Sequence, residues 1–101
     1  MNRTEILQKA VDTYGRRMQE DICIEEMSEL TKALIKCCRV KQEHEESETA
    51  EENVLEEIAD VQIMLDQMRI IYGGTSDWEN FKIKRLKSRL SAARRKDNEY
   101  N

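Results

Sequence analysis

Apolar residues recur three and four positions apart along most of the chain, which is the spacing of one face of an α-helix. This period predicts four helices, at about 4–14, 16–40, 50–72 and 76–96. Gly15 and the pair Gly73-Gly74 mark two of the boundaries, and Ser76 or Asp77 can cap the last helix. Four amphipathic helices with short connections predict an all-α fold, an antiparallel four-helix bundle.

The longest connection is a polar, acidic segment at about 41–52 (KQEHEESETAEE), in which Ala50 is the only apolar residue. We expect a mobile connection there, and a frayed tail at 97–101. A chain of 101 residues without a dividing linker is expected to be a single domain over 1–101.

Composition narrows the function classes. The net charge of −4 disfavours nucleic acid as the primary partner. No apolar run approaches the roughly 20 residues that span a bilayer, and the N-terminus lacks the apolar region of a signal peptide, so we expect a cytoplasmic protein with no membrane partner. The cysteines (Cys23, Cys37, Cys38) are then expected to be reduced, and a zinc site is disfavoured because His44, the only histidine, has no CxxC pair near it.

Several carboxylates lie on the apolar faces of the two central helices. In projection Glu26 falls about 40° from Ile22, inside the apolar arc of the second helix, and Glu29 lies at the edge of that arc. On the third helix Glu57 falls within the apolar arc and Asp60 at its margin. Two helices thus each turn a carboxylate pair, spaced three residues apart, toward a shared core.

Ionised carboxylates gathered in a core are costly unless a cation neutralises them. Carboxylate oxygens suit Mg²⁺, or Mn²⁺ as a substitute, and magnesium commonly also reaches substrate phosphates. The alternative is ion pairing, since Lys32 and Lys36 follow Glu29 along the same helix. A di-iron carboxylate site is disfavoured because no histidine follows these glutamates at the required spacing.

These residues resemble a known enzyme family. Glu25-Glu26-Met27-Ser28-Glu29, followed by Glu57-Ile58-Ala59-Asp60, is similar to the EExxE…ExxD pattern of the MazG-type, all-α nucleoside triphosphate pyrophosphohydrolases. The similarity extends from about Tyr14 to Leu90. Either half of the pattern is common in charged helices, so the resemblance rests on both halves in order on consecutive helices.

The resemblance implies an enzyme that cleaves an NTP or dNTP between its α- and β-phosphates, giving the monophosphate and pyrophosphate. Glu26, Glu29, Glu57 and Asp60 would be the Mg²⁺ ligands, and either Glu26 or Glu29 would be the general base. This agrees with the chemistry of phosphoryl transfer, in which metal ions offset developing charge and orient water.

Basic and amide residues complete the implied site. Lys32 follows the first motif, and Lys82 and Arg85 resemble a basic K-x-x-R segment that would approach the triphosphate, although they could equally form a solvated face. The family has an asparagine seven residues after the motif aspartate, where this chain has Gln67. These four residues are the predicted substrate-binding set.

Partners and alternatives follow from the same features. Long apolar stripes on a short chain favour self-association, and the resemblance implies a homodimer or homotetramer with sites near subunit interfaces. A phosphoribosyl-ATP pyrophosphohydrolase-like enzyme shares the carboxylate pattern. From another class, a non-catalytic helical interaction module stays open.

Overall fold

The computed structural model describes the backbone of residues 1–100 and the side chains of residues 1–96. It contains four helices: α1 (Arg3–Tyr14), α2 (Arg16–Gln42), α3 (Glu48–Tyr72) and α4 (Ser76–Tyr100). No strand occurs in these 100 residues, which confirms the all-α prediction. Among the described helices, none is both long and apolar enough to cross a membrane.

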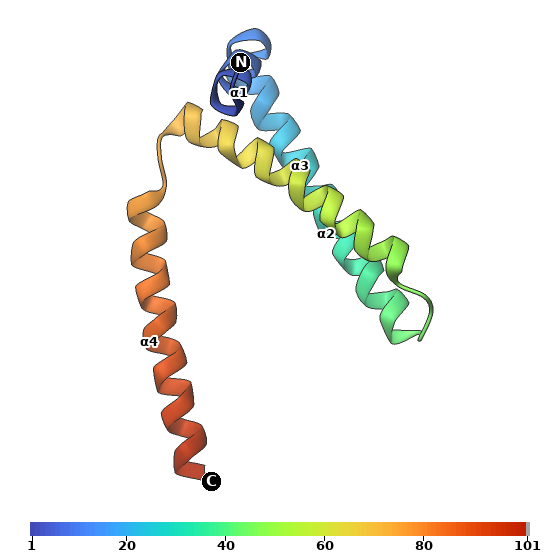
Figure 1. Cartoon of the computed structure of the whole chain (residues 1–101), viewed down its shortest axis with the longest axis vertical. Helices are drawn as coiled ribbons and strands as arrows, with labels where there is room; N and C mark the ends of the chain where they lie inside the picture. The colour runs from blue at the N-terminus through green and yellow to red at the C-terminus, as the bar shows by residue number, and fades with distance from the viewer. Residues whose placement is uncertain (101) are drawn as a thin grey trace.

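The centre of the molecule is a hairpin of the two long helices α2 and α3, which lie side by side along their length (Figure 1). The short helix α1 packs across the open end of this hairpin and contacts both helices. The core is small. Its buried apolar residues are Leu7, Cys23, Ala33, Cys37, Val61 and Met64.

Gly15 separates α1 from α2, as its place in the sequence predicted. Its φ of 87° lies in the region that favours glycine. Its amide donates to the carbonyl of Val11 at the end of α1, and its own carbonyl accepts from Gln19 in α2. One residue therefore closes one helix and opens the next.

The connection between α2 and α3 is shorter than predicted, residues 43–47 instead of 41–52. Helix α2 ends at Gln42, and His44 follows it with a φ of 56°. Two bonds close this turn, from the amide of His44 to the carbonyl of Lys41 and from that of Glu45 to the carbonyl of Val40. Helix α3 begins early because Glu48 and Glu51 in its first turn suit the positive end of the helix dipole. Lys41 also pairs with Glu51, with 2.8 Å between Nζ and Oε1.

Helix α4 departs from the predicted four-helix bundle. Over the residues that the structure describes, it packs against none of α1, α2 and α3, and it extends away from the hairpin (Figure 1). Thr75 fixes where it starts, because its hydroxyl accepts from Arg69 in α3 at 2.9 Å and donates to Glu79 in α4 at 2.6 Å. The helix includes residues 97–100 of the predicted frayed tail, whereas residue 101 lies outside the described residues.

Candidate metal centre

Three of the four predicted ligands meet where α2 faces α3. Glu26, Glu57 and Asp60 each direct one carboxylate oxygen into a group whose members all lie within 4.8 Å of one another. Glu26 comes from the middle of α2, and Glu57 and Asp60 are one turn apart on α3. All three side chains are half-buried, as the helical projections predicted for carboxylates facing a shared core.

The environment opposes ionisation of two of these groups. Partial burial is the main cause that raises the pKa of Glu57, and the charges of Asp60, Glu26 and Glu29 add to it. The pKa of Glu26 is raised in the same way, first by burial and then by Asp60 and Glu29. The centre is thus a place where negative charge accumulates in partly dehydrated surroundings.

No basic side chain among residues 1–96 forms an ion pair with these three carboxylates. One oxygen, Oε2 of Glu57, is buried and accepts no hydrogen bond from the described residues. A buried carboxylate oxygen without a partner is costly, and a cation is the partner that its chemistry suits best. The donor set therefore fits a divalent cation that prefers oxygen ligands.

Glu29, the fourth predicted ligand, does not belong to this group. Its side chain is exposed and lies beside Lys32, with 3.6 Å between Nζ and Oε1. It is still close enough that its charge contributes to the raised pKa of both Glu26 and Glu57. Glu25 is exposed as well, as its projection indicated.

The predicted substrate-binding residues are dispersed. Lys32 lies beside Glu29, one and a half turns from Glu26 on α2. Gln67 is buried between the helices, and only 3% of it is exposed. Lys82 and Arg85 are exposed on α4, away from the carboxylates of their own chain.

Gln19 is a residue that sequence reasoning missed. Its Nε2 donates to Oε1 of Gln67 at 2.7 Å, and both amides are buried. Gln19 precedes Glu26 by two helical turns, as Gln67 follows Asp60 by two turns, so the pair lies on the same inner face as the carboxylates. The sequence did contain a signal for this pair: each glutamine lies seven residues from a motif carboxylate, Gln19 before Glu26 and Gln67 after Asp60.

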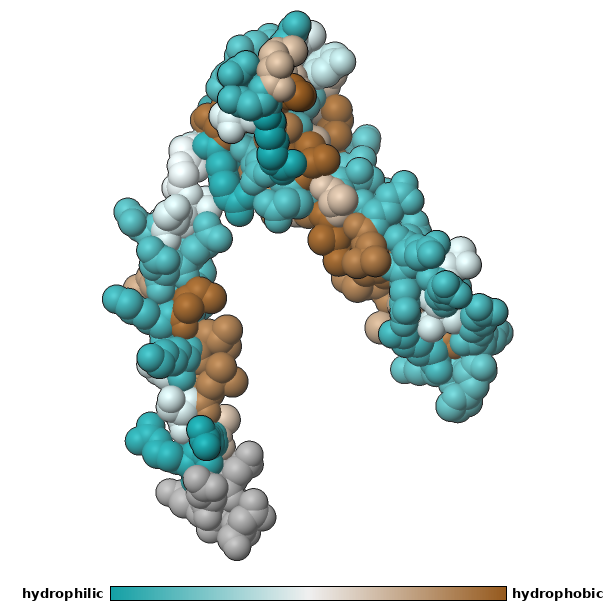
Figure 2. Space-filling model, in the orientation of Figure 1, coloured by the Kyte–Doolittle hydropathy of each residue, from teal (hydrophilic) through white to brown (hydrophobic). Residues whose placement is uncertain are grey.

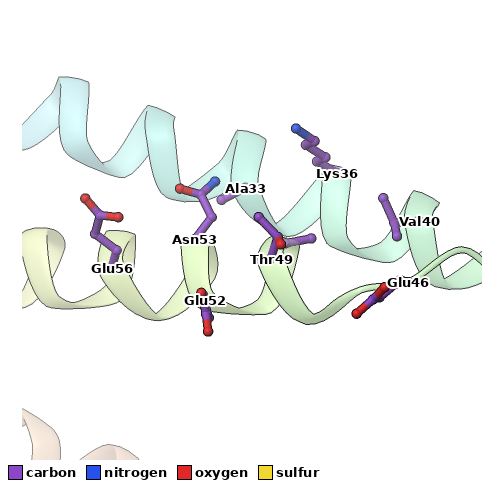
Figure 3. Close-up of a pocket in the computed structure, with 9 residues that line it drawn as sticks. Ala33, Lys36, Val40, Glu46, Thr49, Glu52, Asn53 and Glu56 are labelled. Atoms are coloured by element: carbon purple, nitrogen blue, oxygen red, sulfur yellow. The ribbon is translucent and has the colours of Figure 1, made fainter.

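A groove of about 530 Å³ lies between α2 and the first turns of α3. Its lining includes Ala33 and Lys36 of α2 and Asn53 and Glu56 of α3. Asn53 and Glu56 point from α3 toward α2, whereas Glu52 points away (Figure 3). Glu56 lies one turn before Asp60 on the same face of α3, so the end of the groove at Glu56 is next to the three carboxylates.

No protein-family model, no curated protein and no solved structure matches this chain.

Proposed function

We propose that the protein is a Mg²⁺-dependent nucleoside triphosphate pyrophosphohydrolase that cleaves an NTP or dNTP between its α- and β-phosphates. The observation that carries this proposal is the meeting of Glu26, Glu57 and Asp60, with the partnerless Oε2 of Glu57 among them. The resemblance of the sequence to the EExxE…ExxD pattern supplies the reaction.

Glu26, Glu57 and Asp60 would hold the cation. Their hard oxygen ligands favour Mg²⁺, with Mn²⁺ as a substitute, over zinc or iron. When bound, such an ion offsets the negative charge that develops on phosphate oxygens. The chain's own contribution is to hold the three carboxylates from two packed helices, so that their positions are fixed before substrate arrives.

Glu29 is suited to accept a proton from the attacking water. It lies beside the three carboxylates but outside their group, and its exposed side chain is accessible to solvent. Glu26 is the other predicted base, and its oxygen is committed to the cluster. We therefore assign Glu29 as the general base and Glu26 as a ligand.

The groove beside Glu56 is the proposed site for the nucleoside. Its volume lies within the range of small-molecule sites, and Asn53 offers both a donor and an acceptor to a base or sugar. Lys32 and Lys36 are the nearest cations of α2 that could contact phosphates. A triphosphate bridging the carboxylates and the groove would lie along the hairpin.

The experiment is pyrophosphate release from a panel of NTPs, dNTPs and phosphoribosyl-ATP, with and without Mg²⁺. The proposal expects Mg²⁺-dependent release that Glu57→Gln abolishes and that Glu48→Gln, an exposed residue of α3 outside the groove, largely retains. Turnover of phosphoribosyl-ATP alone would indicate a phosphoribosyl-ATP pyrophosphohydrolase-like enzyme. Orthophosphate as the only product would contradict the proposed bond of cleavage.

A non-catalytic interaction module is the second candidate. The exposed apolar face of α4 favours it, because such a face is typical of a surface that binds another protein. Cation binding without turnover of any substrate in the panel would support this candidate over the enzyme.

A further inference from the structure

Helix α4 carries an apolar row that none of residues 1–96 covers. Five large apolar side chains on it are between 49% and 66% exposed: Trp78, Phe81, Ile83, Leu86 and Leu90. Isolated apolar residues on a surface are ordinary, but a row along an entire helix is not. A helix with no tertiary contacts is also marginally stable in water, since most helical stability comes from packing an apolar face.

The α2–α3 hairpin carries a matching surface, which we call the apolar groove. It combines two cavities on one side of the hairpin, one of about 410 Å³ and one of about 310 Å³. Its apolar lining consists of Cys23, Ile24, Met27, Leu34, Cys37, Cys38, Val54, Leu55, Leu65 and Met68, with the ring of Tyr72 at one end. Apolar side chains gather both on the middle of the hairpin and on the side of α4 that faces it (Figure 2).

The area left uncovered is as large as a dimer interface. The chain exposes 8387 Å², whereas a compact monomer of 12.0 kDa exposes about 6,000 Å². The excess, about 2,400 Å² per chain, is in the range that obligate homodimers bury. The radius of gyration, 18.5 Å against about 13 Å for a compact domain of this length, also indicates an open shape.

Charge separates along the chain in a complementary way. Residues 1–75 hold nine Lys and Arg against seventeen Asp and Glu, a net charge of −8, whereas residues 76–96 hold eight against two, a net charge of +6. On α4 a row of cations, Lys82, Arg85 and Arg89, lies on the same face as the apolar residues, between Phe81 on one side and Leu86 on the other. Glu20 and Glu51 line the two parts of the apolar groove, where each also pairs with a cation of its own chain, Arg16 and Lys41 respectively.

From these observations we infer that the apolar groove of one copy is covered by α4 of a second copy, and the reverse, in a symmetric dimer. The apolar row from Trp78 to Ala93 spans about 22 Å, and the groove from Leu55 to Met68 spans about 20 Å. Such an exchange covers two apolar faces on each chain and brings a basic helix against an acidic hairpin. This inference does not depend on the metal centre or on the proposed reaction.

Sedimentation equilibrium of the full chain tests the oligomeric state. The inference expects a dimer of wild type, and at least a tenfold weaker dimer for Leu86→Glu. Ser91→Glu adds the same charge on the opposite side of α4 and is expected to dimerise as wild type does. Circular dichroism checks that both variants keep their helices, because Leu86 contacts no other helix within the chain and its replacement leaves α1–α3 unchanged.

A second measurement identifies the contact. A mixture of ¹⁴N- and ¹⁵N-labelled chains is cross-linked with a carbodiimide, which joins lysine amines to carboxylates without a spacer. Cross-links between Lys82 and Glu20 or Glu51 are expected in mixed-isotope pairs. The inference would be overturned by a monomeric wild type or by a dimer that Leu86→Glu does not weaken. It would also be overturned if every cross-link between α4 and the hairpin joined two peptides of the same isotope.

Discussion

A carboxylate oxygen of Glu26 in α2 lies within 4.8 Å of one of Asp60 in α3, although the two residues come from different helices. Glu57 adds a third carboxylate to the same place. Groups of like charge oppose one another's ionisation, so their meeting is unfavourable for the metal-free fold. Such an arrangement is understandable if the protein gains from it when a cation binds.

The first prediction concerns the free energy of unfolding without metal. Because the pKa of Glu57 is raised above its ordinary value of 4.5, the native state binds a proton more tightly than the unfolded chain does. The contribution of Glu57 therefore becomes less favourable as pH rises from 4.5 through the raised pKa. Glu57→Gln is expected to be more stable than wild type at pH 7, and the difference is expected to vanish well below pH 4.5.

Urea denaturation at several pH values, in the presence of a metal chelator, measures the difference in the free energy of unfolding between wild type and Glu57→Gln. Glu56→Gln, the exposed neighbour, is the control and is expected to show no comparable gain at neutral pH. A Glu57→Gln protein that is less stable than wild type at pH 7 would mean that a favourable partner holds this carboxylate.

The second prediction concerns the buried amide pair. Gln67→Leu leaves the amide of Gln19 buried without a partner, which is expected to cost about 1–3 kcal/mol of the free energy of unfolding. The double change Gln19→Leu with Gln67→Leu removes both polar groups and is expected to recover most of that loss. Chemical denaturation of the single and double variants measures it, and equal losses from both would contradict this account of the pair.

The third prediction concerns the contact between α3 and the start of α2. The hydroxyl of Tyr72 donates to Glu20, and this bond is the largest cause that lowers the pKa of Glu20, followed by Arg16. Tyr72→Phe is expected to move the pKa of Glu20 back toward its ordinary value, as followed by carboxyl ¹³C shifts in an NMR titration. Tyr14→Phe is the control, and an unchanged Glu20 titration in Tyr72→Phe would contradict the assignment.

The fourth prediction concerns the end of α2. His44 has a φ of 56°, a left-handed conformation that costs a residue with a Cβ roughly 1 kcal/mol. His44→Gly is expected to raise the free energy of unfolding by about that amount, whereas His44→Ala is not. Thermal and urea unfolding of both variants would measure this, and a gain from alanine equal to that from glycine would point to the imidazole instead of the backbone.

Much of this architecture was predictable from the chain. The 3.6-residue period located all four helices, and Gly15 located the first boundary. The inward position of Glu26, Glu57 and Asp60 followed from the same period, because a carboxylate within or beside the apolar arc of a helix lies on the side that packs against the neighbouring helix. Local pattern was sufficient for each of these predictions.

Other features depended on contacts that local pattern does not encode. The acidic segment 41–52 is polar except for Ala50, yet seven of its twelve residues are helical because of the favourable first turn of α3 and the pair between Lys41 and Glu51. Glu29 fell at the edge of the arc, where a small rotation decides between the cluster and the solvent. The position of α4 could not be predicted from its own amphipathic pattern. The period indicates that one face of the helix is apolar, but it does not indicate whether the same chain or another molecule covers that face.

The most direct test of the central claim is the equilibrium binding of Mn²⁺, measured by calorimetry at pH 7 on wild type, Glu57→Gln and Glu56→Gln. If Glu26, Glu57 and Asp60 form a cation site, wild type binds the ion, and Glu57→Gln binds it at least about tenfold more weakly, a loss of about 1.4 kcal/mol or more. Glu56→Gln removes only a neighbouring charge and is expected to weaken binding much less than Glu57→Gln does. Equal affinity in wild type and Glu57→Gln, or no binding by folded wild type, would contradict the claim.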